Sequence, residues 1–202
     1  MHKITHRIES FARYGALTAV AIEWLSVLGF YISNPNNFSG QYPLSYFATI
    51  PQTRPIFSIC YTLAALSFWI FVKYHLSRHY QAPTKIFTAS MLGFATVAIV
   101  PFSFDDPVSS TIHNLSTLFF TVTFIAGMYL MSRSNSDARV KIVSGLTAAL
   151  STIFVILFWF IQKDSHLVLL FEAGSGLACQ LWMIWISFHA FRKSRETISS
   201  PA

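Results

Sequence analysis

Long apolar runs separated by short polar segments dominate the pattern of hydrophobic and polar positions along the chain. Six such runs are present, over residues 11–32, 55–73, 85–101, 111–132, 140–162 and 167–191. Each is close to the roughly 20 residues that a helix needs to cross the apolar core of a bilayer. Strands of a membrane barrel would be segments of about ten residues with alternating polarity, and these runs do not alternate. The pattern therefore predicts an all-α fold, an integral membrane bundle of six transmembrane helices forming one domain over residues 1–202.

The composition agrees with a membrane protein and excludes an ordinary soluble domain. Hydrophobic residues make up 53% of the chain and charged residues 11%, whereas about a quarter of the residues are charged in soluble domains. The two cysteines, Cys60 and Cys179, both fall inside apolar runs. A thiol in such a place behaves as a small hydrophobic side chain. The cysteines therefore indicate no metal site, we assign no metal-binding residues, and the sequence leaves any cofactor unknown.

The basic residues predict how the bundle is oriented. Of the 14 lysines and arginines, only Arg54 and Lys163 lie outside the two tails and the second and fourth loops. Cytoplasmic loops of membrane proteins carry an excess of Lys and Arg, so both termini are expected in the cytoplasm and loops one, three and five outside. Membrane orientation thus accounts for the net charge of +6. Because the basic residues show no interleaved aromatic residues, we expect no nucleic-acid partner.

Two carboxylates stand inside the apolar runs and need a physical reason to be there. Glu23 lies near the middle of the first run and Glu172 near the start of the sixth. Insertion of an ionisable group into lipid costs about 2.5 to 3.5 kcal/mol, and such groups often mark function. The alternative is a carboxyl group that fastens two helices together by a hydrogen bond.

Further ionisable residues are expected at the outer side of the membrane. His113 opens the fourth run, with Ser109 and Ser110 predicted as helix caps before it. Asp105 and Asp106 precede it in the third loop, and Arg54 begins the second run on the same side. We expect His113 to lie within direct or one-water reach of a carboxylate, because an unpaired polar group in lipid is costly. The predicted ligand-binding pocket, in the outer half of the bundle, comprises His113, Asp105, Asp106, Glu172, Arg54 and Glu23.

Several short motifs resemble a known family. They are the segment 42–46 (YPLSY), the end of the third run with its two aspartates, the run from His113 to Phe120, and the run from Glu172 to Trp182. Together they resemble the six-helix prokaryotic membrane family catalogued as domain of unknown function 998. More distantly, they are similar to the damage-regulated autophagy modulator type membrane proteins and to the glycosylphosphatidylinositol remodelling proteins related to them. The resemblance implies a multi-pass protein of a prokaryotic plasma membrane and supplies no reaction.

Three functions remain open from the sequence. The first is a bundle that binds a membrane lipid, a small amphiphile or a membrane partner protein through the outer polar pocket. The second is a membrane-embedded lipid hydrolase or transferase, with His113 as base beside Asp105 or Asp106 and with Glu172 as acid or metal ligand. The third is a small proton-coupled transporter that uses Glu23 and Glu172. Whether the protein is an enzyme is left open.

Overall fold

The computed structural model describes residues 11–37, 44–100, 102–160 and 167–199 of the chain. Lys3, Arg7 and Lys163, which contributed to the orientation argument, lie outside these residues. The side chains of Arg192, Lys193 and Arg195 are likewise not described.

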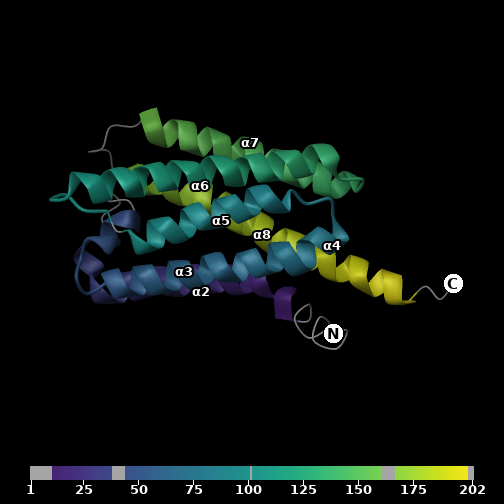
Figure 1. The fold of residues 1–202 in the computed structure, drawn as a ribbon, viewed down its shortest axis with the longest axis horizontal. Coiled ribbons are helices and arrows are strands. Elements are labelled where there is room, and N and C mark those ends of the chain that lie inside the picture. Colours follow the sequence, from purple (N-terminus) through teal and green to yellow (C-terminus); the bar gives the residue numbers. More distant parts are fainter. Residues whose placement is uncertain (1–10, 38–43, 101, 161–166, 200–202) are drawn as a thin grey trace.

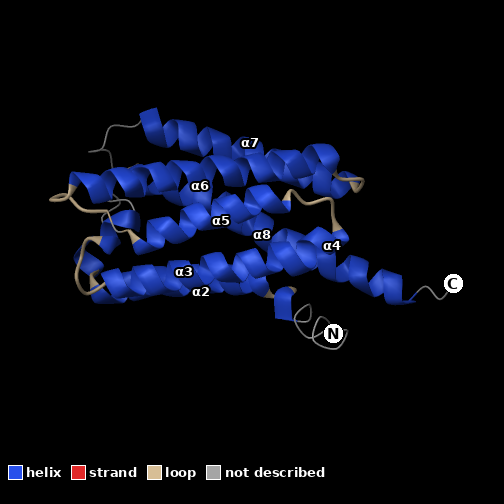
Figure 2. Ribbon diagram, in the orientation of Figure 1, coloured by secondary structure: helices blue, strands red, loops and turns tan. Residues whose placement is uncertain are grey.

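The described residues form an all-helical bundle. Its elements are α2 (Gly15–Ser33), the short helices η1 (Pro35–Asn37) and η2 (Leu44–Ala48), α3 (Arg54–Phe71), the π-helical turn η3 (Val72–Leu76), α4 (Ser77–His79), α5 (Thr84–Ile99), α6 (Pro107–Ser134), α7 (Ala138–Phe160) and α8 (Val168–Ser199). Counting α3, η3 and α4 as one continuous helix, six long helices follow the six predicted runs closely. In the part of the chain that is described there is no strand (Figure 2). The all-α prediction is thus confirmed.

Four of the helices are long and apolar enough to cross a membrane. They are Gly15–Ser33, Arg54–His79, Pro107–Ser134 and Ala138–Phe158, whereas α5 is apolar but has only 16 residues. Large apolar side chains such as Leu25, Ile142 and Leu146 are more than 60% exposed on the outside of the bundle. Apolar surface on this scale marks a contact with lipid or with another protein. These features indicate a multi-pass protein embedded in a membrane.

The helices pack as two antiparallel pairs with α5 between them (Figure 1). One pair is α2 with α3 and the other is α6 with α7, while α5 packs on both α3 and α6. Helix α8 crosses the bundle obliquely and contacts both α7 and α2. The start of α2 and the end of α8 lie at the same end, together with the connections 80–83 and 135–137 (Figure 1). We call this the basic-loop end, and the opposite end, with the connecting residues 34–37, 44–53, 100 and 102–106, the acidic-loop end.

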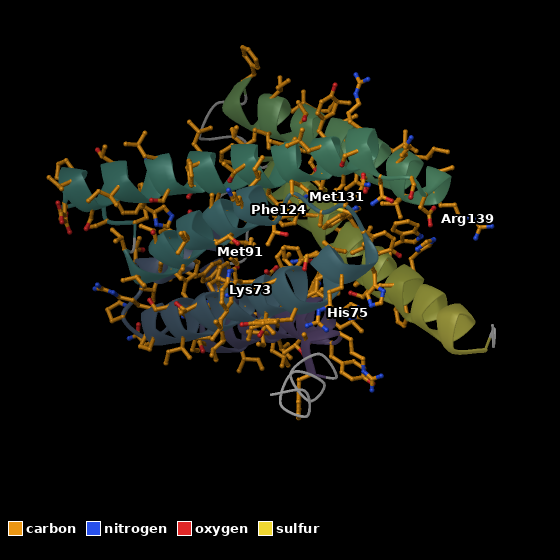
Figure 3. All side chains as sticks on the ribbon, turned by 45° about the vertical axis from the view of Figure 1, so that its right-hand side comes forward. Lys73, His75, Met91, Phe124, Met131 and Arg139 are labelled. Atoms are coloured by element: carbon orange, nitrogen blue, oxygen red, sulfur yellow. The ribbon has the colours of Figure 1, made fainter. Side chains whose placement is uncertain are left out.

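Aromatic side chains fill the centre of the bundle. Phe124 of α6 meets Phe68 of α3, Phe87 of α5 and Trp182 of α8, with ring centroids 5.5 to 5.9 Å apart. Gly127 makes this possible, because a Cβ atom there would lie only 2.6 Å from the Phe87 ring. Figure 3 shows Phe124 between the helices and the exposed Arg139 at the edge of the molecule. The core thus fixes how α3, α5, α6 and α8 are arranged, and with them the positions of the loops at both ends.

Candidate functional site

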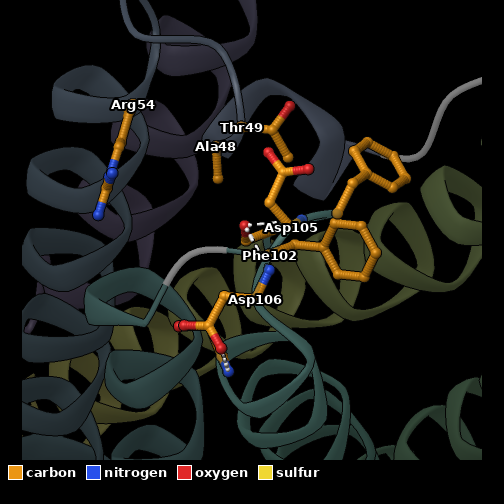
Figure 4. Close-up of a pocket in the computed structure, with 9 residues that line it drawn as sticks. Ala48, Thr49, Arg54, Phe102, Asp105 and Asp106 are labelled. Atoms are coloured by element: carbon orange, nitrogen blue, oxygen red, sulfur yellow. Dashed lines mark hydrogen bonds between the residues drawn. The ribbon is translucent and has the colours of Figure 1, made fainter.

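A cavity of about 320 Å³ opens at the acidic-loop end (Figure 4). The described residues that line it are Ala48, Thr49, Arg54, Phe102, Ser103, Phe104, Asp105, Asp106 and Ser109. They come from the end of η2 and the residue after it, the first residue of α3, and the connection from α5 together with the first turn of α6. This acidic-loop pocket brings together Arg54, Asp105 and Asp106, three of the six residues predicted for the site.

Hydrogen bonds within the α5–α6 connection hold the aspartates in place. The Ser103 hydroxyl accepts from the backbone N–H groups of Asp105 and Asp106, at 3.3 and 3.2 Å. The Ser110 hydroxyl donates to the Ser103 carbonyl and accepts from its N–H group at 3.2 Å. The connection is therefore a folded turn, which presents the two carboxylates at defined positions.

Asp106 also starts helix α6. Its Oδ1 accepts from the N–H groups of Val108 and Ser109, at 3.0 and 3.3 Å, and Pro107 follows as the first helical residue. The hydrogen bonds from Ser109 and Val108 favour the charged form and lower the pKa of Asp106. The sequence prediction that Ser109 and Ser110 cap this helix was wrong. An aspartate followed directly by proline is a stronger start signal than a serine inside the first turn.

Arg54 reaches the pocket from a rigid support. The buried Thr53 hydroxyl donates to the Phe47 carbonyl at 2.5 Å, which ties the start of α3 to the end of η2. Arg54 itself is exposed, and Figure 4 places it across the pocket from Asp105 and Asp106. Over the described residues no ion pair joins it to either aspartate. Among the described residues of the lining, one positive charge thus faces two negative charges across the cavity.

His113 does not join this group. Its side chain is 2% exposed, and Nδ1 lies 2.8 Å from the Val100 carbonyl oxygen at the end of α5. It is not among the residues that line the pocket, and within the described residues no hydrogen bond links it to Asp105, Asp106 or Glu172. The expected direct bond between His113 and a carboxylate is therefore absent among the described residues, and contact through one water stays a prediction. A backbone carbonyl freed where α5 ends is the partner instead.

Glu172 of α8 bonds to the backbone of η2, in the connection between α2 and α3. Its Oε2 accepts from the Leu44 N–H group at 2.6 Å, and the Ser45 backbone also bonds to the carboxylate. Leu44 is the first residue of η2, so the carboxylate satisfies N–H groups that the short helix leaves open. Glu172 and the acidic-loop pocket are thus two separate features at the same end of the bundle.

Glu23 bonds across to another helix. Its Oε2 accepts from Nε2 of Gln180, which joins α2 to α8. Gln180 was missed in the sequence, although it stands eight residues after Glu172 and therefore on the same side of α8. This pairing agrees with the alternative that Glu23 fastens two helices.

A second cluster of polar residues, also missed, lies at the basic-loop end. The Tyr80 hydroxyl is 2.5 Å from Nδ1 of His189, and Nε2 of His189 is 3.6 Å from a carboxylate oxygen of Asp137. Burial, reinforced by the negative charge of Asp137, raises the pKa of Tyr80. The phenol therefore keeps its proton and donates to Nδ1, which leaves the hydrogen on Nε2 facing Asp137. Tyr80 is 109 positions from His189 in the sequence, and Asp137 is 52 positions from it, so no local pattern reveals the cluster.

In the described part of the chain, no group of three or more His, Cys, Asp or Glu side chains is placed to hold a metal ion.

Comparisons of the sequence and structure with protein-family models, with curated proteins and with solved structures give no match. The candidate site therefore depends on its own geometry.

Proposed function

We propose that this protein binds a membrane lipid or a small amphiphile through the acidic-loop pocket. The observation that carries the proposal is the set of charges around the cavity. Arg54, Asp105 and Asp106 line the same space from two sides without forming an ion pair among the described residues. A binding pocket needs such a cavity together with a few placed polar groups. A membrane partner protein would be an alternative occupant of the same pocket.

The proposal includes six membrane-spanning helices, with α5 and α8 as the third and sixth. It places both termini in the cytoplasm of a prokaryotic cell and the acidic-loop end outside its plasma membrane. Support comes from the charges: Arg13, Arg78, Arg133 and Arg139 belong to the basic-loop end, which cytoplasmic orientation favours. A cysteine introduced at Ser103 should react with a membrane-impermeant thiol reagent in intact cells, and one at Ser136 should not. The reverse pattern would contradict the orientation.

The other two functions receive less support from the geometry. A hydrolase would need His113 in contact with an activating carboxylate and with the cavity, and His113 is instead bonded to the Val100 carbonyl. A transporter would need Glu23 and Glu172 on a common path, and each is engaged with a different structural partner.

Binding at the pocket can be tested with protein purified in a maltoside detergent. Short-chain phospholipids should raise the midpoint of thermal unfolding, because a ligand that binds the native state stabilises it. The variant Arg54→Gln should lose most of this response, since it removes the one cation among the described residues of the pocket lining. Arg133→Gln is the matched control, because Arg133 is an exposed arginine at the opposite end that bonds only to Tyr129 among the described residues. An equal response in the wild type and in both variants would contradict the proposal.

A further inference from the structure

We infer that the acidic-loop pocket selects a zwitterionic headgroup, in which a phosphate and an ammonium group are joined by a short linker. This inference rests on the proposed function and adds the chemical class of the ligand. The cavity, at about 320 Å³, is at the small end of the roughly 300 to 1,000 Å³ that small-molecule pockets span. It therefore has the size for a headgroup, with any acyl chains left outside.

Arg54 supplies the phosphate side. A guanidinium group can donate two parallel hydrogen bonds to a phosphate, which makes arginine the usual residue for this group. The first turn of α3 fixes where the side chain starts, because Thr53 anchors it to Phe47.

Asp105 and Asp106 supply the ammonium side. Asp106 caps α6 through Oδ1, its carboxylate also interacts with the Ser109 side chain, and it lines the pocket with a negative charge. The Asp105 carboxylate accepts no hydrogen bond in the part of the chain described. Phe102 and Phe104 line the same side, with ring centroids 5.1 Å apart at nearly right angles. Carboxylates and aromatic faces are both groups that attract an ammonium ion.

The balance of charge decides between a zwitterion and a simple anion. Among the described residues the lining carries one positive and two negative side chains, so an anionic headgroup at Arg54 would also meet two like charges. Like charges placed against a competing ligand are an effective means of discrimination. In a zwitterionic headgroup the ammonium group is attracted to the two aspartates while the phosphate binds Arg54. The zwitterion therefore matches the charges of the pocket better than the anion does.

The surroundings of the pocket favour a lipid as the source of this headgroup. Helix α5 ends at Ile99, and the connection that follows it forms part of the pocket. Ile99 is 66% exposed, and Ile59 of α3 and Leu115 of α6 are each 61% exposed about one to two turns inside their helices. Acyl chains of a lipid bound at the pocket would therefore lie along apolar surface rather than in water.

The test measures the unfolding midpoint of the detergent-purified protein against three soluble probes. These are dihexanoyl phosphatidylethanolamine, dihexanoyl phosphatidylglycerol with the same acyl chains, and glycerophosphoethanolamine with none. We expect the ethanolamine lipid to reach half of its maximal effect at a concentration about tenfold below the glycerol lipid, equivalent to about 1.4 kcal/mol. A weak response to glycerophosphoethanolamine supports a lipid source. A response as strong as that of the lipid supports the same headgroup chemistry with a free aminoalkyl phosphate as ligand.

The double variant Asp105→Asn/Asp106→Asn isolates the ammonium side. Asparagine is as good a helix cap as aspartate, so α6 should still start normally. We expect this variant to bind the two lipids about equally, because Arg54 remains while the negative charges are gone. The control Arg133→Gln should keep the preference of the wild type.

The outcomes separate this inference from the proposed function. If the wild type responds equally to both lipids and Arg54→Gln abolishes the response, the pocket binds lipid but the zwitterion inference is overturned. If the double variant keeps the full preference for the ethanolamine lipid, the aspartates do not select the headgroup and the inference is again overturned. If no probe stabilises the wild type, or if Arg54→Gln responds fully, the proposed function itself fails.

Discussion

The two ends of the bundle use their polar side chains differently. At the basic-loop end, His189 contacts both the Tyr80 hydroxyl and the Asp137 carboxylate. At the acidic-loop end, the cavity is lined by Arg54, Asp105 and Asp106, which form no ion pair among the described residues. The side chains of His189 and Asp137 are 17% and 23% exposed, while Arg54, Asp105 and Asp106 are exposed. Polar groups that bond to each other add to stability, and their binding capacity is used up. Polar groups that face a cavity keep that capacity for a ligand. This difference agrees with a structural role for the polar cluster at the basic-loop end and supports the proposed binding at the acidic-loop end.

The largest effect should come from removing the middle of the basic-loop cluster. His189→Ala leaves the Tyr80 hydroxyl and the Asp137 carboxylate without their shared partner, and also removes a ring packed 5.0 Å from Trp185. We expect the free energy of unfolding to fall by about 3 kcal/mol, since two partly buried polar groups lose a bond. Unfolding in mixed micelles measures this change. Arg54→Ala is the control at the other end and should change stability by less than about 0.5 kcal/mol. Similar losses of the free energy of unfolding in His189→Ala and Arg54→Ala would contradict the structural difference between the two ends.

Glu172 tests whether bonding, rather than location, decides the role of a polar group. It lies at the acidic-loop end but is bonded to the Leu44 N–H group. Glu172→Ala should lower the free energy of unfolding by about 2 kcal/mol because it leaves that donor without its carboxylate. Glu172→Gln keeps an oxygen acceptor and should preserve the folded protein and its response to lipid. A selective loss of the lipid response in Glu172→Gln would instead place Glu172 in the binding site.

Tyr80→Phe probes a single bond of the basic-loop cluster. The substitution removes only the hydroxyl that donates to His189, and we expect a loss of about 1 kcal/mol in the free energy of unfolding. Tyr129→Phe is the matched control, because Tyr129 is 48% exposed and bonds to the exposed Arg133. Chemical unfolding of both variants checks the difference, and equal values would show that the cluster adds no stability.

The smallest effect concerns the acid side of the pH profile. The folded protein lowers the pKa of Asp106, so this group contributes stability above its unfolded pKa and loses that contribution as the pH falls through the folded value. The midpoint of thermal unfolding of Asp106→Asn should therefore fall less steeply on acidification than the midpoint of the wild type does. Asp137→Asn at the other end is the comparison variant, and an unchanged slope in Asp106→Asn would contradict the role of its charge in capping α6.

The sequence predicted the features that depend on local pattern. Apolar runs of sufficient length became helices because backbone groups in lipid must be satisfied within the segment. The starts of α3 and α6 place Arg54 and Asp106 at the same end, so the expectation that these charges meet there followed from the alternation of six helices. The start of α6 was predicted four residues late, at 111 instead of Pro107, because the capping role was assigned to Ser109 and Ser110.

The pairing of polar groups was decided by the tertiary structure alone. His113 was expected to face a carboxylate, yet the end of α5 offers it the Val100 carbonyl. Glu23 met Gln180 because α8 crosses obliquely to reach α2. The physical reason is that hydropathy fixes which segments lie in the membrane, while the choice among several possible partners depends on helix rotation and crossing. Those are set by packing around residues such as Phe124 and Gly127, whose effect appears only once the helices are assembled.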